Sequence, residues 1–227
     1  MSLPLYDCFI LPYDSKSVCQ WASKFIDFRL TALKSAPKDS TSSYELEAAI
    51  PEHEWVSTLS KPAFRVLLCT PRHAGDAATP VWDREWAGIL CMHGPRYKHQ
   101  TTDNCTTSTW YLGSGFVVPT HRGNRALREL FFFGVQQARN LDLRLHHQRR
   151  FQTAACRTSI QIIAWADDPK TIGYYRTGGL RITERLTLEE YSKRGWNLLY
   201  NQDHLRMPIV VMEKDIMSQE TVIMSRL

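Results

Sequence analysis

The chain has 227 residues, 43% of them hydrophobic and 22% charged, and its 28 Lys+Arg against 23 Asp+Glu give a formal net charge of +5. This composition is typical of a globular protein and excludes wholesale disorder, a collagen-like repeat and a coiled coil. No proline- or glycine-rich linker divides the sequence, so we expect a single domain over residues 1–227.

The sequence predicts neither a membrane anchor nor a secretion signal. The longest apolar run, Phe131–Val135, is far shorter than the roughly 18 residues of a spanning helix. Asp7 and Asp14 fall where a signal peptide would be uncharged. The six cysteines are scattered without metal-ligand spacing, which predicts free thiols in a reducing compartment and no metal site. We therefore expect an intracellular protein with no membrane partner.

The last three residues, Ser225-Arg226-Leu227, have the small–basic–leucine form of a peroxisomal address. A receptor reads such a tripeptide only at a free C-terminus. The predicted location is thus cytoplasmic or, if the tripeptide is read, peroxisomal.

The first half of the chain predicts a strand, a group of helices and three further strands. Asp14 or Ser15 can cap the first helix, and Pro51 divides the next helical pattern in two. In chain order, the expected elements are a strand at 5–12, a helix from 14 or 15 to about 36, two short helices within 44–59, strands at 64–70 and 86–93 joined by a long loop, a polar linker at 94–108, and a strand at 110–118.

The second half alternates helices with strands, which favours one mixed α/β sheet. The nearly continuous apolar run at 159–166 predicts a strand covered on both faces. Asp168-Pro169 has the residues of a helix start, and Thr187 with Glu190 has capping-box spacing. The expected elements are a helix from 122 to about 141, a strand at 159–166, a helix from 168 to the glycines at 178–179, extended residues at 180–183, a short helix from 187, and a last strand at 207–214.

The densest basic stretch is Arg139–Arg150. Leucines at 141, 143 and 145 give it an amphipathic pattern, which favours a solvated helix or loop face over a phosphate-binding surface. Because +5 is a mild charge, nucleic-acid binding is the least favoured function class and no nucleic-acid partner is expected.

The informative unit is a strand, a tight turn at 119–123 and a helix whose first turn is Asn124–Leu127. Unpaired N–H groups and a partial positive charge make a helix N-terminus a suitable site for phosphate or pyrophosphate. Here Val117-Val118-Pro119-Thr120-His121-Arg122-Gly123 resembles the V-x-P-x-x-R-G turn of the GNAT acyl-CoA N-acyltransferase family.

Three other segments resemble this family in order and spacing. They are Trp86–Leu90, the segment from Asp168 through Tyr174-Tyr175 to Gly179-Leu180, and Val211–Lys214. The resemblance implies a GNAT-type α/β fold, a mixed sheet of about seven strands flanked by helices, with two strands that splay to admit acyl-CoA. The sequence departs from the family at Arg125 and Leu127, which replace glycines of the phosphate loop.

The resemblance also implies the site residues. Backbone groups of one strand end would pair with the pantetheine arm, N–H groups of the following turn would hold the pyrophosphate, and Asp168 would also contribute to cosubstrate binding. The implied cosubstrate-binding residues are Phe116, Val117, Val118, Arg122, Gly123, Asn124, Arg125, Ala126, Leu127 and Asp168.

Tyr175 falls at the family's usual general-acid position. A tyrosine with a pKa of about 10 can donate a proton to a leaving thiolate whose conjugate acid has a pKa of about 8.5. Each residue also has a structural alternative: Tyr174 and Tyr175 as core aromatics, Asp168 as a helix cap, and Arg122 as a support of the turn.

The general base and the acceptor stay open at this stage. No carboxylate lies on the strand at 109–118, where many family members have a Glu, and we list four candidate bases: Glu85, His93, Asp167 and His204. Aromatic residues at 25–59 and 183–206 could line a pocket for an apolar or aromatic amine, or complete a core.

The predicted function is acetyl transfer from acetyl-CoA to a primary amine of a small molecule by direct attack, without a metal and without a covalent enzyme intermediate. The alternative is a non-catalytic acyl-CoA-binding or interaction module with a degenerate GNAT fold, favoured by the missing glycines and the missing strand carboxylate. The oligomeric state stays open, with a homodimer as one option.

Overall fold

The computed structural model describes residues 6–73, 78–100, 105–123, 125–149, 155–196 and 198–216, and it leaves the side chains of residues 99, 100, 105, 145–149, 155 and 156 undescribed. Two predicted features, Asn124 and the tripeptide Ser225–Leu227, lie outside these ranges. Across the described ranges, no helix combines the length and the apolar character that crossing a bilayer requires.

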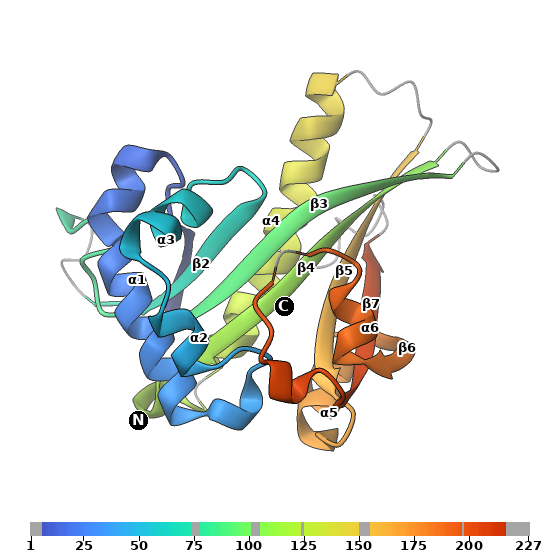
Figure 1. The fold of residues 1–227 in the computed structure, drawn as a ribbon. Coiled ribbons are helices and arrows are strands. Elements are labelled where there is room, and N and C mark those ends of the chain that lie inside the picture. Colours follow the sequence, from blue (N-terminus) through green and yellow to red (C-terminus); the bar gives the residue numbers. More distant parts are fainter. Residues whose placement is uncertain are drawn as a thin grey trace.

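Seven strands form one mixed sheet in the order β1-β2-β3-β4-β5-β7-β6 (Figure 1). The strands are β1 (Tyr6–Ile10), β2 (Phe64–Pro71), β3 (Gly88–Gln100), β4 (Cys105–Val117), β5 (Ala155–Trp165), β6 (Arg181–Thr187) and β7 (Pro208–Ile216). β4 and β5 pair in parallel, and the other neighbours pair antiparallel. The predicted mixed sheet of about seven strands is confirmed.

Helices cover both faces of this sheet. They are α1 (Ser15–Ser35), α2 (Tyr44–Ala48), α3 (Glu52–Leu59), α4 (Ala126–Arg149), α5 (Pro169–Thr177) and α6 (Leu188–Ser192), with 3-10 turns η1 (Pro37–Asp39), η3 (Pro119–His121) and η4 (Gln202–His204). The predicted caps are confirmed: the Asp14 side chain accepts from the Ser17 N–H at 2.9 Å, and Thr187 and Glu190 form a capping box.

Each face has its own apolar core. We call the side of α1–α3 the front face, where Trp21, Phe25 and Trp55 pack on β2 and β3. We call the side of α4 and α5 the rear face, where Leu130 and Ile172 pack on the central strands. In Figure 1 the long strands β3 and β4 cross in front of α4. The sheet thus separates two apolar cores.

The predicted linker at 94–108 is wrong. β3 continues to Gln100 and β4 begins at Cys105, and the two pair from Arg96↔Thr109 to Gln100↔Cys105. Threonine is β-branched and favours strands, so the range that we interpreted as polar loop is a hairpin. The hairpin extends beyond α1–α3 (Figure 1), and its polar Ser108 is buried and donates to Asp142 of α4.

Candidate functional site

The two parallel strands diverge halfway along the sheet. β4 and β5 pair from Cys105↔Ala155 to Tyr111↔Gln161, and beyond this pair they continue to Val117 and Trp165 without pairing each other. We call this divergence the splay. The predicted splayed strands are therefore present, and the backbone edge of β4 that faces β5 has no strand partner there. Such an edge can accept an extended ligand as an added strand.

A β-bulge follows directly after the splay point. Ile89 is opposite Phe116 and Cys91 is opposite Gly113, so the bulge places Ser114 and Gly115 against the single residue Leu90. Ser114 has φ 54°, and a Cβ added to Gly113 would lie 2.4 Å from the Tyr111 ring. Bulges free backbone groups from the ladder and occur often beside active sites. Here the freed groups lie next to the splay.

The predicted pantetheine-binding strand end is held in place by Arg122. The Val118 N–H donates to the Ala87 carbonyl at 3.0 Å, so by strand alternation the Val117 backbone points away from β3, toward the splay. The Val117 carbonyl accepts from Arg122 Nε at 3.1 Å, and the guanidinium lies 5.5 Å from the centre of the Phe116 ring. The structure thus brings together Phe116, Val117, Val118 and Arg122.

The helix after the turn begins later than predicted. α4 starts at Ala126 rather than Arg122 because Gly123 and Arg125 have φ of 78° and 67°, in the left-handed region that no helix continues through. The Arg125 carbonyl accepts from the Glu129 N–H at 2.9 Å, so the first-turn N–H groups from Ala126 onward face the turn without helical partners. Arg125 therefore has a backbone conformation that glycine adopts readily and that other residues adopt rarely.

A chain of polar groups braces this turn. His121 Nδ1 lies 3.0 Å from the Tyr6 hydroxyl, and His121 Nε2 lies 3.1 Å from Glu85 Oε1. The hydrogen bond from His121 lowers the pKa of Glu85. Glu85, one of the candidate bases, therefore supports the turn, and β1 is coupled to it through Tyr6.

Tyr175 lies on the rear side of the splay. Its ring is 5.7 Å from Phe131 and 5.3 Å from Tyr174, and burial raises its pKa to about 12. A pocket of about 260 Å³ opens beside these rings between α4 and α5. It is lined by Arg128, Phe131, Phe132, Tyr174, Thr177 and Gly178. Asp168 caps α5, accepting from the Thr171 N–H at 3.0 Å, and its predicted role toward the cosubstrate stays a prediction.

The front side of the splay contains a group of residues that the sequence analysis did not identify. Tyr111 is buried, with its ring 5.8 Å from Trp196 and 6.3 Å from Tyr191. Tyr191 Oη and Trp196 Nε1 donate to Gln161 Oε1 at 2.8 and 3.2 Å. Tyr111 and Gln161 are the last paired residues of β4 and β5, so these contacts surround the splay point.

A buried ion pair lies beside this group. Arg29 and Glu47 are 7% and 3% exposed, and Arg29 Nε and Nη2 donate to the two Glu47 carboxylate oxygens at 2.8 and 2.7 Å. One sequence signal could have identified Arg29: it lies on the apolar stripe of α1, four residues after Phe25 and four before Leu33. Nothing local in the sequence identifies Glu47 as its partner.

The other candidate bases lie in different surroundings. His93 pairs with Tyr111 across β3 and β4, with ring centroids 5.9 Å apart, and burial lowers its pKa to about 4. Asp167 is exposed in the turn after β5, and His204 packs against Trp165 with ring centroids 5.6 Å apart. Of the four, His93 is the one beside Tyr111, and it is neutral at pH 7.

The basic stretch at 139–150 contains a buried acid. Residues 139–149 continue α4 beyond the predicted end at about 141, and within them Asp142 is 3% exposed. It accepts hydrogen bonds from the Ser108 hydroxyl, from Trp110 Nε1 at 2.9 Å and from Thr158 Oγ1 at 2.7 Å. Asp142 therefore holds α4 against the paired halves of β4 and β5, which keeps the base of the splay closed.

No protein-family model matches the chain, and no curated protein sequence matches it. Solved structures do match. The chain has the fold of the GNAT acetyltransferases, with a structural likeness that covers 92% of its length.

Two of these structures are NAA60 from Arabidopsis thaliana in complex with a bisubstrate analogue and an acetyltransferase of the GNAT family from Streptococcus pneumoniae. The first matches over 99% of its own length at 10% identity, with a TM-score of 0.54. The second matches over 100% of its length at 12% identity, with a TM-score of 0.53. NAA60 in complex with acetyl-CoA matches with a TM-score of 0.54 at 12% identity, over 92% of this chain and 99% of that one. At these identities the likeness establishes the fold.

Proposed function

We propose that the chain is an acyl-CoA-dependent N-acetyltransferase that transfers acetyl from acetyl-CoA to a primary amine of a small molecule. The observation that carries this proposal is the arrangement of three features along residues 111–126: the splay, the bulge directly after it, and a helix N-terminus at the end of the same strand. A similar fold has been solved with acetyl-CoA bound, in NAA60.

The residues present fit this cosubstrate. The Val117 edge offers its N–H to the pantetheine arm, as an added strand would use it, while the Val117 carbonyl already accepts from Arg122 Nε. The turn from Arg122 to Leu127 offers backbone donors and two arginine side chains to the pyrophosphate. Arg125 has the left-handed φ of 67° that a glycine would adopt, so the backbone of the turn follows the same path, and its exposed side chain can approach a phosphate.

The reaction we propose is direct attack. The amine nitrogen forms a bond to the thioester carbonyl carbon, and N–H groups freed at the bulge stabilise the oxyanion. The C–S bond then breaks, and Tyr175 donates its phenolic proton to the departing thiolate, since a pKa of about 12 keeps the phenol protonated at neutral pH. The proton that the amine loses passes through water to the Tyr175 phenolate and restores the phenol, because His93, with a pKa of about 4, is a weak base.

The test is calorimetric titration with acetyl-CoA and with CoA, followed by a thiol-release screen over primary amines. We expect 1:1 binding at micromolar Kd and thiol release with some amine. Arg122→Ala should weaken binding, whereas the matched Arg181→Ala should not, because Arg181 is exposed on β6 and pairs with Asp215 at 3.6 Å.

Three results would change the assignment. Binding without thiol release would favour the non-catalytic acyl-CoA-binding module. No binding at millimolar acetyl-CoA would contradict both functions. Acetylation of a cysteine by acetyl-CoA alone, detected by mass spectrometry, would replace direct attack by a covalent intermediate.

A further inference from the structure

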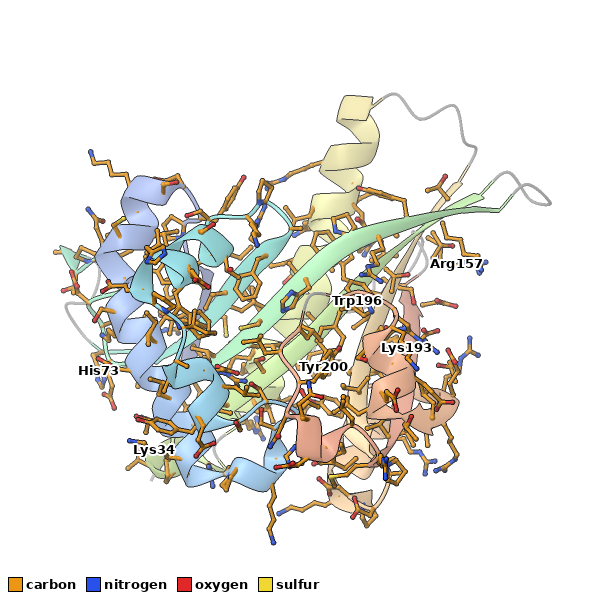
Figure 2. The ribbon with its side chains drawn as sticks, viewed as in Figure 1. Lys34, His73, Arg157, Lys193, Trp196 and Tyr200 are labelled. Atoms are coloured by element: carbon orange, nitrogen blue, oxygen red, sulfur yellow. The ribbon has the colours of Figure 1, made fainter. Side chains whose placement is uncertain are left out.

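A segment of chain crosses the front side of the splay. It comprises Trp196 and Leu198–Asn201, between α6 and η4, and we call it the strap. Figure 2 labels Trp196 and Tyr200 in front of the central strands. Both lie close to the splay point, because the Trp196 ring is 5.8 Å from Tyr111 and Tyr200 packs against the apolar cluster that contains Tyr111 and Trp196. The strap therefore covers the side of the splay opposite Tyr175.

Hydrogen bonds hold the strap at both ends. Arg96 stacks 3.9 Å over the Trp196 ring and donates to the carbonyls of Arg194 and Gly195. At the other end the Asn201 N–H donates to the Thr41 carbonyl at 2.8 Å, in the loop between α1 and α2.

A second bond joins the same two sides of the splay, from Trp165 Nε1 to the Lys38 carbonyl at 2.9 Å. Lys38 and Thr41 both belong to the connection between α1 and α2, whereas Trp165 and Asn201 belong to β5 and the strap. A polypeptide laid across the front of the splay would have to break these bonds. The contacts therefore favour a small acceptor over a protein terminus or a lysine-rich tail.

Three carboxylates near the strap already have partners among the described residues. Glu47 holds Arg29, Glu213 accepts from Gln161 Nε2 at 2.7 Å, and Glu184 pairs with Arg194. A polyamine carries two or more ammonium groups, each of which needs a carboxylate to replace its hydration. The surroundings of the strap are instead aromatic, with Tyr111, Tyr191, Trp196 and Tyr200, and they suit an aromatic ring.

One polar group on the strap has no partner in the protein. The Tyr200 hydroxyl is buried and makes no hydrogen bond with the described residues. Buried hydroxyl groups are nearly always hydrogen-bonded. Among the described residues other buried hydroxyls, such as those of Tyr174 and Thr70, also lack a partner, and the Tyr200 hydroxyl is the one on the strap, where an acceptor would satisfy it. A primary amine can donate an N–H to this oxygen or accept its proton.

We propose that the acceptor is a small primary monoamine with an aromatic body, which packs against Tyr111 and Trp196 and whose nitrogen is hydrogen-bonded to the Tyr200 hydroxyl. This inference rests on the proposed acetyl transfer and names the class of its acceptor.

The first experiment compares three acceptors with the full chain and acetyl-CoA: 2-phenylethylamine, spermidine, and a six-residue peptide with a free N-terminal amine. We expect kcat/KM for 2-phenylethylamine to exceed the other two at least about tenfold. Spermidine or the peptide at equal or higher kcat/KM would overturn the inference. Acetyl-CoA binding without release from 2-phenylethylamine would overturn it too, whereas no acetyl-CoA binding would mean that the proposed function itself has failed.

The second experiment tests the Tyr200 contact. Tyr200→Phe should raise KM for 2-phenylethylamine about tenfold and leave the Kd for acetyl-CoA unchanged. The matched control is Tyr13→Phe, since Tyr13 is 42% exposed and follows β1, the edge strand that β2 and β3 separate from β4. An unchanged KM in Tyr200→Phe would remove the hydroxyl from acceptor binding and contradict the inference.

The third experiment opens the strap. Asn201 has φ −67°, which proline adopts without strain, so Asn201→Pro removes the N–H bond to Thr41. Asn201→Ala is the control, because it keeps this N–H and loses only the side-chain cap on Asp203. We expect kcat/KM for the peptide to rise about tenfold in Asn201→Pro alone. Equal values in both variants would contradict the role of the strap, provided that both still bind acetyl-CoA.

Discussion

The two sides of the splay are built in different ways. On the rear side, the turn at 119–125 and the start of α4 follow β4 directly along the chain, and the expected ligand contacts are backbone N–H and carbonyl groups. On the front side, Arg29, Glu47, Tyr111, Tyr191 and Tyr200 come from four separate elements and the strap, and their side chains define the surface.

Because the two sides are built differently, we expect substitutions on them to have different effects. Backbone donors bind the same ligand groups whichever side chains surround them, so the rear side can keep one cosubstrate while its sequence changes, as at Arg125. Side chains from distant elements change the chemistry of a surface with each substitution, so in our proposal the front side selects the acceptor. Substitutions on the front should therefore alter stability and acceptor choice, and substitutions on the rear should alter cosubstrate binding and chemistry.

The largest effect is expected on the front side, from removal of Glu47. Glu47→Ala leaves the buried Arg29 without a partner, which should lower the free energy of unfolding by about 3–5 kcal/mol in urea titrations. Glu189→Ala is the control, because Glu189 pairs with Lys193 on the exposed surface of α6 at 3.1 Å and should contribute less than about 1 kcal/mol. Equal losses in the two variants would contradict the distinction between the buried and the exposed pair.

The second effect is a loss of stability in acid caused by His93. Its pKa falls from 6.5 to about 4 on folding, so the unfolded chain binds more protons between these values. Stability should be complete above pH 6.5 and fall by about 3 kcal/mol as the pH drops to 4. His93→Gln should remove this part of the pH dependence in unfolding curves recorded from pH 4 to 7. If the variant keeps the wild-type dependence of unfolding free energy on pH, that dependence arises from other titratable groups.

The third effect is on the rear side and concerns chemistry. Tyr175→Phe removes the proposed acid, and kcat should fall about 100-fold while the Kd for acetyl-CoA stays the same. Because burial raises the pKa of Tyr175 to about 12, the wild-type kcat should not decline from loss of this proton between pH 7 and 10. An alkaline decline with a midpoint below pH 10, or an unchanged kcat in the variant, would remove Tyr175 from this role.

The smallest effect is at Arg125. A left-handed φ of 67° is unfavourable for arginine, and Arg125→Gly should raise the free energy of unfolding by about 0.5–1 kcal/mol. Arg128→Gly, three residues later inside α4, should lower it by about 1 kcal/mol, because glycine is a poor helix residue. If both variants change the free energy of unfolding in the same direction, the assignment of strain to Arg125 is contradicted.

The sequence by itself determined the elements and their order. Local signals placed α1 behind Asp14, divided α2 from α3 at Pro51, and started α5 and α6 at their caps, because capping and proline effects act within one helical turn. The resemblance over the turn at 117–123 led to the splayed sheet that the structure has. The turn and the start of α4 follow β4 along the chain, so a contiguous pattern could identify this segment, while the roles of its residues toward a cosubstrate stay predictions.

Tertiary structure alone decided the rest. The range 94–108 was interpreted as a linker because its residues are polar. Threonine also favours strands, but only the pairing of β3 with β4 shows that this range is a hairpin. Glu47 with Arg29, Asp142 with Thr158 and Tyr200 beside Tyr111 are contacts between elements far apart in the chain. The contribution of each contact to stability or binding depends on its burial. Burial is set by how the helices and the strap pack on the sheet, and no local sequence pattern encodes this packing.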